Sequence, residues 1–324
     1  IDQQNNLFPE STQWFLSGRS ALNAIIKELG EARSVSLPSW CCDSMIKPFV
    51  DARLKVRFYP VYWSEGQLVQ EWLFDCDVLF LIDYFGYTGN SINLNGYKGV
   101  IIRDVTHSIF SATFDDADYY FGSLRKWCGI WTGGFTWTRD GHQLEVNDVD
   151  DFGYVNFRKK AMTLKEQFIN NQEGEKREYR KLFEYAENSL DMVEMSPAAK
   201  KDIWCAKHLD VDLIKEHRRR NAKMLMDAFK DLLLFPEMRD MDCPMFVPIM
   251  IPDGKREELR KYLIEKEIYC PIHWPLSEYH KENMKKDKIY QSELSLVCDQ
   301  RYDADDMRRM IGAINTWKKR ECKD

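Results

Sequence analysis

The sequence has no long hydrophobic run and no excess of positive charge. Its longest apolar runs, such as VLFLI at 78–82, are far shorter than the ~20 residues of a membrane-spanning helix. The formal net charge of -6 argues against a nucleic-acid groove as the main function. A basic run at Arg218-Arg219-Arg220 lies inside a helical pattern, and we interpret it as a solvated helix face. We therefore expect no membrane partner and no nucleic-acid partner.

The nine cysteines form no Cys-x-x-Cys pair and show no metal-ligand spacing. Cys41 and Cys42 are adjacent, which is a poor geometry for a disulfide. Reduced thiols, no metal and a cytoplasmic location are the expectation. The opening residues IDQQNNLFPE contain neither a basic nor an apolar signal-peptide region, and the missing initiator Met leaves the native start open.

The first half of the chain alternates short apolar runs with helical patterns. A helix is predicted over 20–30, where apolar residues recur on one face and Gly30 is suited to end the helix. Strands are predicted at 35–38, 54–61, 78–85, 99–104, 117–123 and 133–138. Nearly continuous apolar strands of this type belong to a sheet that is covered by helices on both faces. We predict an α/β fold, a three-layer sandwich with a mostly parallel sheet.

The pattern becomes helical and highly charged from about 155 to 232. One long amphipathic helix is predicted from Leu213 to Phe229. The remainder predicts strands at 245–252, 268–273 and 294–298, a helix at 256–266 and a final helix from Asp303. We predict a large domain at 1–205 and a small C-terminal α+β domain at 206–324.

Lys126 is the first candidate for chemistry. It ends the run Ser123-Leu124-Arg125-Lys126, directly after a predicted strand, and a Thr-Gly-Gly turn follows at 132–134. A lysine in a partly desolvated pocket there would have a lowered pKa and be nucleophilic toward an aldehyde. The short run alone is also compatible with a surface lysine in a loop.

Three other segments add candidates. Asp104 ends a predicted strand, and His107 follows three residues later. Side chains at the ends of strands in open α/β sheets point toward the ligand. The ordinary alternatives are that Asp104 is a turn residue and that His107 is a core histidine. Ser17-Gly18-Arg19-Ser20-Ala21 opens the first helix, where a phosphate binds well, although an ordinary Ser cap also explains it. His273 lies in a Pro-flanked loop that could reach over a crevice. A helix start, a strand-end Asp, a Lys and a Gly-Gly turn occur in the order that one cofactor would need.

These segments resemble the DegT/DnrJ/EryC1/StrS family, the pyridoxal 5'-phosphate (PLP) dependent sugar aminotransferases with the aspartate-aminotransferase fold. The family's first helix is similar to the segment SGRSALNAIIKELG. Its Asp-containing stretch is similar to VIIRDVTHSIFSA, and its lysine loop is similar to SLRKWCGIWTGGF. EKEIYCPIHWPLSEY resembles its small-domain segment. The resemblance runs over nearly the whole chain.

The resemblance implies the role of each site residue. Lys126 would bind the cofactor aldehyde covalently, Asp104 would hold the pyridine nitrogen protonated, and His107 would lie beside the cofactor. Arg19, Ser20, Ala21 and Ser123 would contact the phosphate, Trp40 would stack on the ring, and His273 would lie on the substrate side.

The implied function is transfer of an amino group from glutamate or glutamine to a keto-sugar, probably nucleotide-linked, in surface-polysaccharide or glycoconjugate synthesis. A homodimer with shared active sites is implied as well. The chain departs from the family pattern at Phe121, at Cys42 and in the run 191–195. The alternatives are another PLP enzyme acting on an amino acid, a lyase or a desulfurase, or a degenerate member without catalysis. Cys128, near Lys126, is the cysteine to examine for a desulfurase.

Overall fold

The computed structural model describes residues 4–321 apart from 65, 74, 89–93, 95, 112–115, 148–150, 152, 172, 191 and 281–286. Its chain divides into two compact units. Unit 1 comprises residues 1–31 and 117–209, and unit 2 comprises residues 32–116 and 210–324. The division at 209/210 lies close to the predicted domain boundary at 205/206. Each unit, however, also contains a stretch of the predicted large domain.

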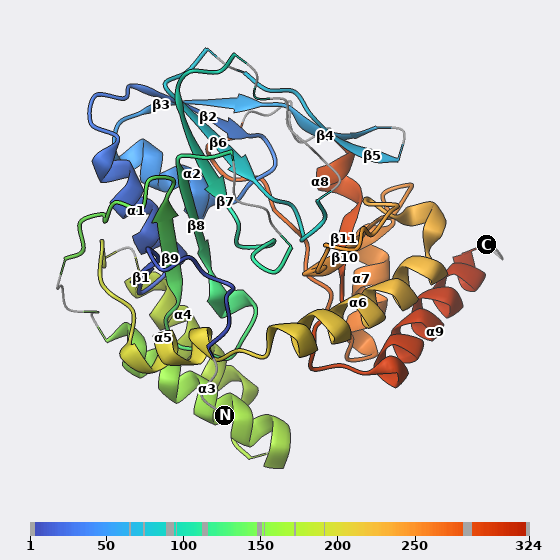
Figure 1. Ribbon diagram of the computed structural model, residues 1–324. Coiled ribbons are helices and arrows are strands. Elements are labelled where there is room, and N and C mark those ends of the chain that lie inside the picture. The colour runs from blue at the N-terminus through green and yellow to red at the C-terminus, as the bar shows by residue number, and fades with distance from the viewer. Residues whose placement is uncertain are drawn as a thin grey trace. The chain divides into compact units, whose positions relative to one another are not determined.

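Unit 1 contains three antiparallel strands. The order is β1-β9-β8, with β1 at Gln13–Phe15, β8 at Tyr119–Ser123 and β9 at Gly134–Thr138. Helix α1 (Gly18–Glu28) packs against β8 and β9 (Figure 1). Ser17 caps this helix by accepting a hydrogen bond from the Ser20 N–H, and Gly30 follows its end with a φ of 60°. The predicted helix at 20–30 is therefore confirmed, with its start two residues earlier.

From residue 154 onward unit 1 is mostly helical, as the charged pattern predicts. Its helices are α3 (Tyr154–Asn171), α4 (Lys176–Ser189) and α5 (Lys200–Lys207). Helices α3 and α4 lie side by side (Figure 1). Buried apolar residues from both helices and from the segments before and after them form one cluster: Leu16, Tyr154, Ala186, Leu190 and Val193.

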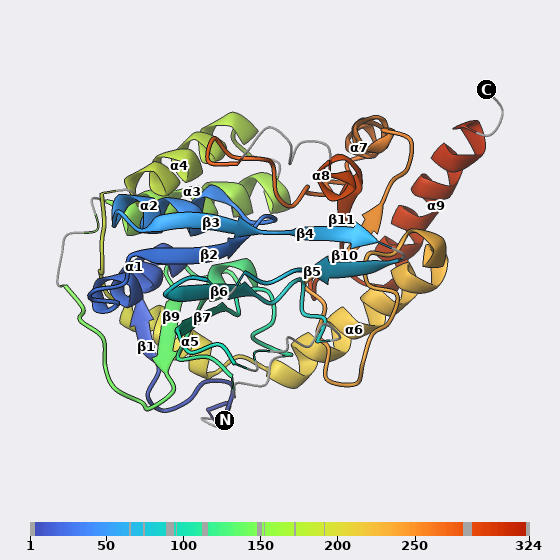
Figure 2. The same ribbon diagram turned by 90° about the horizontal axis from the view of Figure 1, so that it is seen from above.

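Unit 2 contains four parallel strands in the order β7-β6-β2-β3 (Figure 2). They are β2 (Ser34–Pro38), β3 (Lys55–Tyr59), β6 (Val78–Ile82) and β7 (Val100–Asp104), and α2 (Asp43–Asp51) packs on β3. All five residues of β6 are buried, as expected for a central parallel strand. The predicted strand at 78–85 ends at Ile82, because Phe85 has a left-handed φ of 57°.

The predicted strand at 54–61 is two strands. Pro60 separates β3 from β4 (Val61–Ser64), and β4 pairs with β5 (Gln67–Gln70) instead of continuing along β2. Proline has no N–H to donate to a sheet, which explains the break at this residue.

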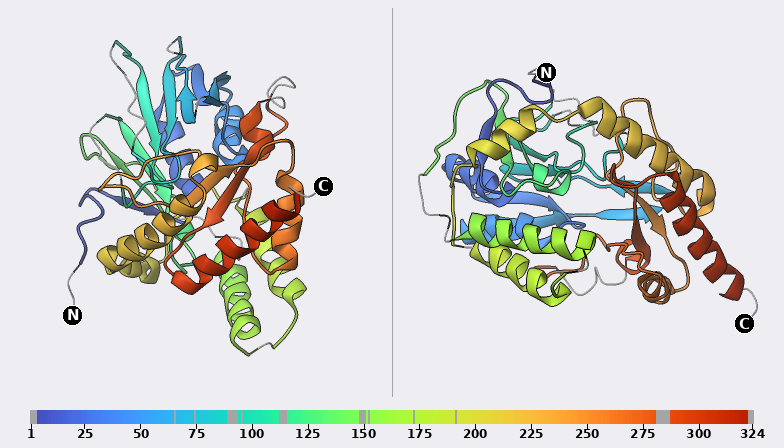
Figure 3. Two further views of the ribbon diagram at one scale, coloured as in Figure 1. Left: turned by 90° about the vertical axis from the view of Figure 1, so that its right-hand side faces the viewer. Right: turned by 90° about the horizontal axis from the view of Figure 1, so that it is seen from below.

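The C-terminal part of unit 2 consists of two antiparallel strands and their helices. The elements are α6 (Val211–Ala228), β10 (Phe246–Met250), α7 (Arg256–Glu265), α8 (Lys288–Ser292), β11 (Glu293–Val297) and α9 (Ala304–Glu321). Helix α9 packs against α6 and α7 (Figure 3). The predicted long helix from Leu213 to Phe229 corresponds to α6, and the predicted last helix to α9. Short 3-10 turns lie at Leu124–Lys126 and Lys230–Leu232.

Two predictions in this region are wrong. Residues 268–273 form no strand, although the Pro271 carbonyl accepts a bond from the Ser295 N–H of β11. Pro271 has no N–H with which to return a bond to that strand. Arg218 is not on a solvated helix face: it is 2% exposed and donates to the carbonyls of Pro244 and Met245. Burial lowers the pKa of Arg218, and these carbonyls satisfy its guanidinium.

No helix among the described residues is long and apolar enough to cross a membrane. In the same part of the chain, no group of three or more His, Cys, Asp or Glu residues could hold a metal ion.

Candidate functional site

The start of α1 lies against the ends of β8 and β9 in unit 1. A Cβ atom at Gly134 would lie 1.9 Å from the carbonyl oxygen of Ser17, so only glycine permits this approach. A Cβ atom at Gly18 would lie 3.3 Å from the Cβ of Ser123. Ser123 is therefore a neighbour of the helix start, where backbone N–H groups and the helix dipole favour an anion.

Ser123 carries an unsatisfied hydroxyl at this place. Its side chain is 7% exposed, and its Oγ has no hydrogen-bond partner among the described residues. A buried hydroxyl without a partner costs stability, so its presence calls for an explanation. A phosphate oxygen bound at the start of α1 would supply the missing partner.

Three predicted phosphate contacts lie in the first turn of α1. Ser20 is buried, and its Oγ lies 3.0 Å from the Oγ of Ser17, while Ala21 is buried on the inner face of the helix. Arg19 is partly exposed. The structure thus brings Ser20, Ala21 and Ser123 into one neighbourhood from segments about a hundred residues apart in the sequence.

Lys126 ends the 3-10 turn that follows β8, three residues after Ser123. Its side chain is exposed, whereas the sequence predicts a partly desolvated pocket. The adjoining residues are held firmly. Arg125 donates to Tyr154 Oη and, at 2.9 Å, to Glu187 Oε1; although burial opposes its charge, Tyr154 and Glu187 raise its pKa overall. The turn is thus rigid while the lysine itself is accessible.

The Thr-Gly-Gly turn is anchored by Asp202 from the first turn of α5. One oxygen of this buried carboxylate accepts from both the N–H and the hydroxyl of Thr132, at 2.8 and 2.7 Å. The hydroxyl of Thr132 accepts in turn from the N–H of Ala199. This network fixes the segment that connects Lys126 to β9.

Cys128 does not have the properties of a reactive cysteine. Burial raises its pKa to about 12, and its Sγ lies 3.5 Å from the carbonyl oxygen of Leu124. A desulfurase needs a thiolate, which this environment disfavours.

In unit 2, Asp104 and His107 lie at the end of β7, as predicted from the sequence. Asp104 is 3% exposed, and its Oδ1 accepts a 2.8 Å bond from the Thr106 N–H, which closes the turn between the two residues. His107 is buried, and its ring stacks on Trp274 at 5.4 Å with an interplanar angle of 20°. Asp104 is therefore a turn residue and His107 a packed core histidine, and neither of these structural roles prevents contact with a ligand.

A cluster of aromatic rings joins the β7 end to the loop after α7. We call it the ring cluster; its members are Trp40, Tyr84, Phe85, His107, His273 and Trp274. The rings of His107 and His273 lie 5.7 Å apart. The structure thus brings the predicted substrate-side histidine to the predicted cofactor-side histidine, although 166 positions separate them in the sequence.

Trp40 lies wholly inside this cluster. Its ring stacks on Tyr84 at 4.9 Å, and its Nε1 donates a 2.7 Å bond to the carbonyl oxygen of His273. Because Trp40 is 0% exposed, a cofactor ring would contact it only after a neighbour such as Trp274 moved. Its predicted stacking role stays a prediction.

Sequence reasoning missed Glu293 and Ser295. The Glu293 carboxyl group is fully buried and accepts from the N–H of His273 at 2.7 Å and from the hydroxyl of Ser295 at 2.5 Å. Ser295 Oγ lies 2.9 Å from His273 Nδ1. Glu293 is the first residue of the strand ELSLV, and a charged residue at the start of an otherwise apolar strand pattern is the signal that could have marked it.

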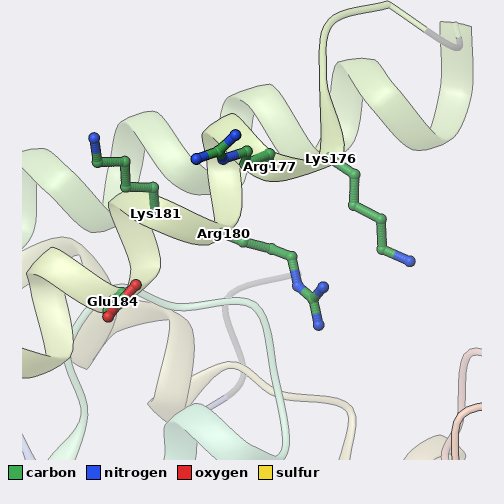
Figure 4. A pocket seen from close by; sticks show the side chains of 5 residues that line it. All are labelled: Lys176, Arg177, Arg180, Lys181 and Glu184. Atoms are coloured by element: carbon green, nitrogen blue, oxygen red, sulfur yellow. The ribbon is translucent and has the colours of Figure 1, made fainter.

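The basic pocket on α4 is not a convincing ligand site. It is lined by Lys176, Arg177, Arg180, Lys181 and Glu184. Figure 4 shows that the basic side chains point away from one another. Converging groups are expected around an anion. We interpret this surface as a solvated helix face.

No family model matches the chain, and no curated protein matches it. Several solved structures do match the chain. A DegT DnrJ EryC1 StrS aminotransferase from Brucella abortus matches with a TM-score of 0.62 and 14% identity, over 94% of this chain and 85% of that one. The putative sugar aminotransferase Spr1654 from Streptococcus pneumoniae, in its apo-form, matches with a TM-score of 0.62 and 13% identity, over 94% and 85%.

A third match is PseC from Helicobacter pylori, an aminotransferase involved in the biosynthesis of pseudoaminic acid. It has a TM-score of 0.61 and 12% identity, over 94% of this chain and 86% of that one. The predicted α/β class and its aminotransferase-like arrangement are confirmed. The chain has the fold of the DegT/DnrJ/EryC1/StrS sugar aminotransferases.

Proposed function

We propose that the chain is a PLP-dependent aminotransferase that transfers an amino group from glutamate or glutamine to a nucleotide-linked keto-sugar in surface-polysaccharide or glycoconjugate synthesis. The observation that carries the proposal is the unpartnered Ser123 hydroxyl beside the start of α1, with Lys126 three residues later. The fold supports it, and Spr1654, which shares that fold, has been solved in a PLP-form and a PMP-form.

The residues of unit 1 fit the phosphate and aldehyde groups of the cofactor. We assign the phosphate to Arg19, Ser20, Ala21 and Ser123, because the helix start attracts an anion and Ser123 has a hydroxyl to donate. Lys126 is assigned to the aldehyde carbon. Its exposed amine would be able to take a proton from the reacting carbon of the substrate and return one to the carbon that the aldehyde supplies.

The residues of unit 2 fit the ring and the substrate. Asp104 is buried with one oxygen committed to the Thr106 N–H, and we assign its carboxylate to a protonated ring nitrogen. His107 and Trp40 are assigned to the ring surroundings and His273 to the substrate. When bound, PLP supplies an electron sink that stabilises negative charge at the reacting carbon.

A covalent-trapping experiment tests this proposal. Purified protein with added PLP is expected to absorb in the visible-violet region, and borohydride is expected to fix the cofactor on Lys126, as peptide mass spectrometry would show. Lys126→Ala should abolish both signals, while the exposed control Lys176→Ala on α4 should retain them. Trapping at another lysine would overturn the site, and no binding at all would indicate a degenerate, cofactor-free protein.

Substrate assays separate the enzymatic alternatives. Keto-sugar nucleotides with glutamate or glutamine should give an amino sugar, whereas turnover of cysteine or another amino acid alone would indicate a desulfurase or a lyase. We also propose a cytoplasmic homodimer with shared active sites, and light scattering on the same preparation gives its mass.

A further inference from the structure

We propose that Glu293 and Ser295 form a hydrogen-bonded relay that determines which ring nitrogen of His273 carries the proton. The relay deepens the proposed function, because it rests on His273 as the substrate-side residue of that site. It makes Glu293 and Ser295 positioning residues, which act on the substrate through His273.

The relay is a continuous chain of short contacts inside unit 2. Glu293 Oε1 lies 2.5 Å from Ser295 Oγ, and Ser295 Oγ lies 2.9 Å from His273 Nδ1. Glu293 and Ser295 are both 0% exposed, so water does not compete for these bonds. The second carboxyl oxygen of Glu293 accepts a 2.7 Å hydrogen bond from the backbone N–H of His273.

The backbone of His273 is held at both of its polar groups. Its N–H donates to Glu293, and its carbonyl oxygen accepts from Trp40 Nε1. The ring itself is oriented by the contact of Nδ1 with Ser295 Oγ. The ring is packed among Phe246, Phe85, Trp274 and His107, at centroid distances of 4.9, 5.3, 5.3 and 5.7 Å. The relay therefore acts on a ring in one orientation.

The direction of the hydrogen bonds depends on the protonation of Glu293. When Glu293 is ionised it only accepts, so Ser295 donates to it and His273 Nδ1–H donates to Ser295; Nε2 then carries no proton. When Glu293 is protonated, Oε1 must hold the proton because Oε2 accepts the His273 N–H. The Ser295 hydroxyl then accepts a hydrogen bond from Glu293 and donates its own to His273 Nδ1. The proton of the neutral His273 ring is therefore on Nε2.

The charge surroundings favour the protonated form of Glu293. Burial raises its pKa to about 8, partly offset by the bonds from Ser295 and His273 N–H and by Arg256 of α7. Strand β10, which pairs with β11, has no titratable side chain at Phe246–Met250. Burial also raises the pKa of Tyr290 in α8, and that of Cys270 to about 12, which keeps both neutral.

At neutral pH the relay thus presents Nε2–H of His273 as a hydrogen-bond donor. The matching substrate group is an oxygen acceptor, such as a sugar hydroxyl or carbonyl oxygen. Above the pKa of Glu293 the same nitrogen of the neutral ring becomes an acceptor.

Nitrogen-15 NMR of the histidine rings in cofactor-free protein tests the relay. The wild-type His273 signals, identified by their loss in His273→Gln, should change from the Nε2–H form to the Nδ1–H form as the pH rises through about 8. Glu293→Gln can donate its amide N–H to Ser295 permanently, so its His273 should stay in the Nε2–H form from pH 6 to 9. Ser295→Ala should give a mixture, and Ser295→Thr should restore the wild-type pattern.

An unchanged tautomer across wild type, Glu293→Gln and Ser295→Ala would overturn the relay. The same variants are then tested for PLP trapping on Lys126, which they should retain. Loss of trapping in the wild type refutes the proposed function and leaves the tautomer result standing. In active enzyme, we expect the KM for the keto-sugar to change across pH 8 in the wild type and to stay constant in Glu293→Gln.

Discussion

At the residue scale, three buried hydroxyls of the described residues have no hydrogen-bond partner, those of Thr12, Ser36 and Ser123, and the Ser123 hydroxyl is the one at the end of β8 beside the start of α1. Nearby hydroxyls in the same strands all have partners: Thr136 Oγ1 donates to the Tyr120 carbonyl at 2.7 Å, and Thr138 Oγ1 to that of His142 at 2.9 Å. A group that costs stability and has no structural partner is a reasonable candidate for ligand binding.

Ser123→Ala should separate ligand binding from stability. We expect the free energy of unfolding without cofactor to be unchanged or raised by up to ~1 kcal/mol, because an unsatisfied hydroxyl is removed. Urea unfolding measures this, while a PLP titration should show weaker affinity, by about tenfold for one lost hydrogen bond of ~1.4 kcal/mol.

The control for Ser123→Ala is Thr136→Val, which loses a hydrogen bond that the structure does make. It should destabilise the protein by ~1 kcal/mol and leave PLP affinity unchanged. A Ser123→Ala protein that is clearly less stable than wild type would mean that the hydroxyl has a structural partner after all.

At the element scale, the approach of α1 to β9 decides where the helix start is placed. Sequence periodicity predicts the helix, its apolar face and its cap, because these depend on residues three and four positions apart. The contact between Ser17 and Gly134 depends on residues that are distant in the sequence, and no local pattern contains it.

Gly134→Ala should disrupt this approach. The new Cβ would lie 1.9 Å from the Ser17 backbone, so α1 or β9 must shift, and we expect a loss of ~3 kcal/mol or more in the free energy of unfolding together with weaker PLP binding. Gly312→Ala in α9 is the matched control. It has open space around its Cβ position, and helix propensity should raise stability by ~0.5–1 kcal/mol. Equal effects of the two substitutions on thermal unfolding would contradict the role of the close approach.

The same scale explains the wrong strand at 268–273. Its alternation of apolar residues satisfies a strand pattern, but Pro271 has no N–H, and the His273 N–H is used by the Glu293 side chain instead of a neighbouring strand. A tertiary contact from a buried carboxyl group thus overrides a local preference, and this override creates the relay.

At the scale of the whole molecule, Glu293 makes stability depend on pH. Its pKa is about 8 when folded, against an ordinary value of 4.5, because burial disfavours the carboxylate. Between these values the folded chain binds more protons than the unfolded chain, so the free energy of unfolding falls as pH rises. The slope from this one group approaches ~1.4 kcal/mol per pH unit and vanishes below about 4.5 and above about 8.

Glu293→Gln should remove this dependence. The difference in unfolding free energy between variant and wild type, from urea melts at pH 5, 6, 7 and 8, should increase steadily in favour of the variant. Other titrating groups are common to both chains and cancel in the difference. A difference that is flat across this range would show that Glu293 is ionised in the folded protein at all of these pH values.

The sequence by itself determined the order of the parts: a capped helix start, a strand-end Asp104, Lys126 after a strand, and a Gly-Gly turn. Each depends on local propensity, and their order matches a known family, so the fold was predictable at 12–14% identity to its solved relatives. Only the tertiary structure brought Ser123 to the start of α1, buried Arg218 and joined His273 to Glu293. Those features depend on the burial and pairing of residues far apart in the chain, and a single sequence carries no local signal of such contacts.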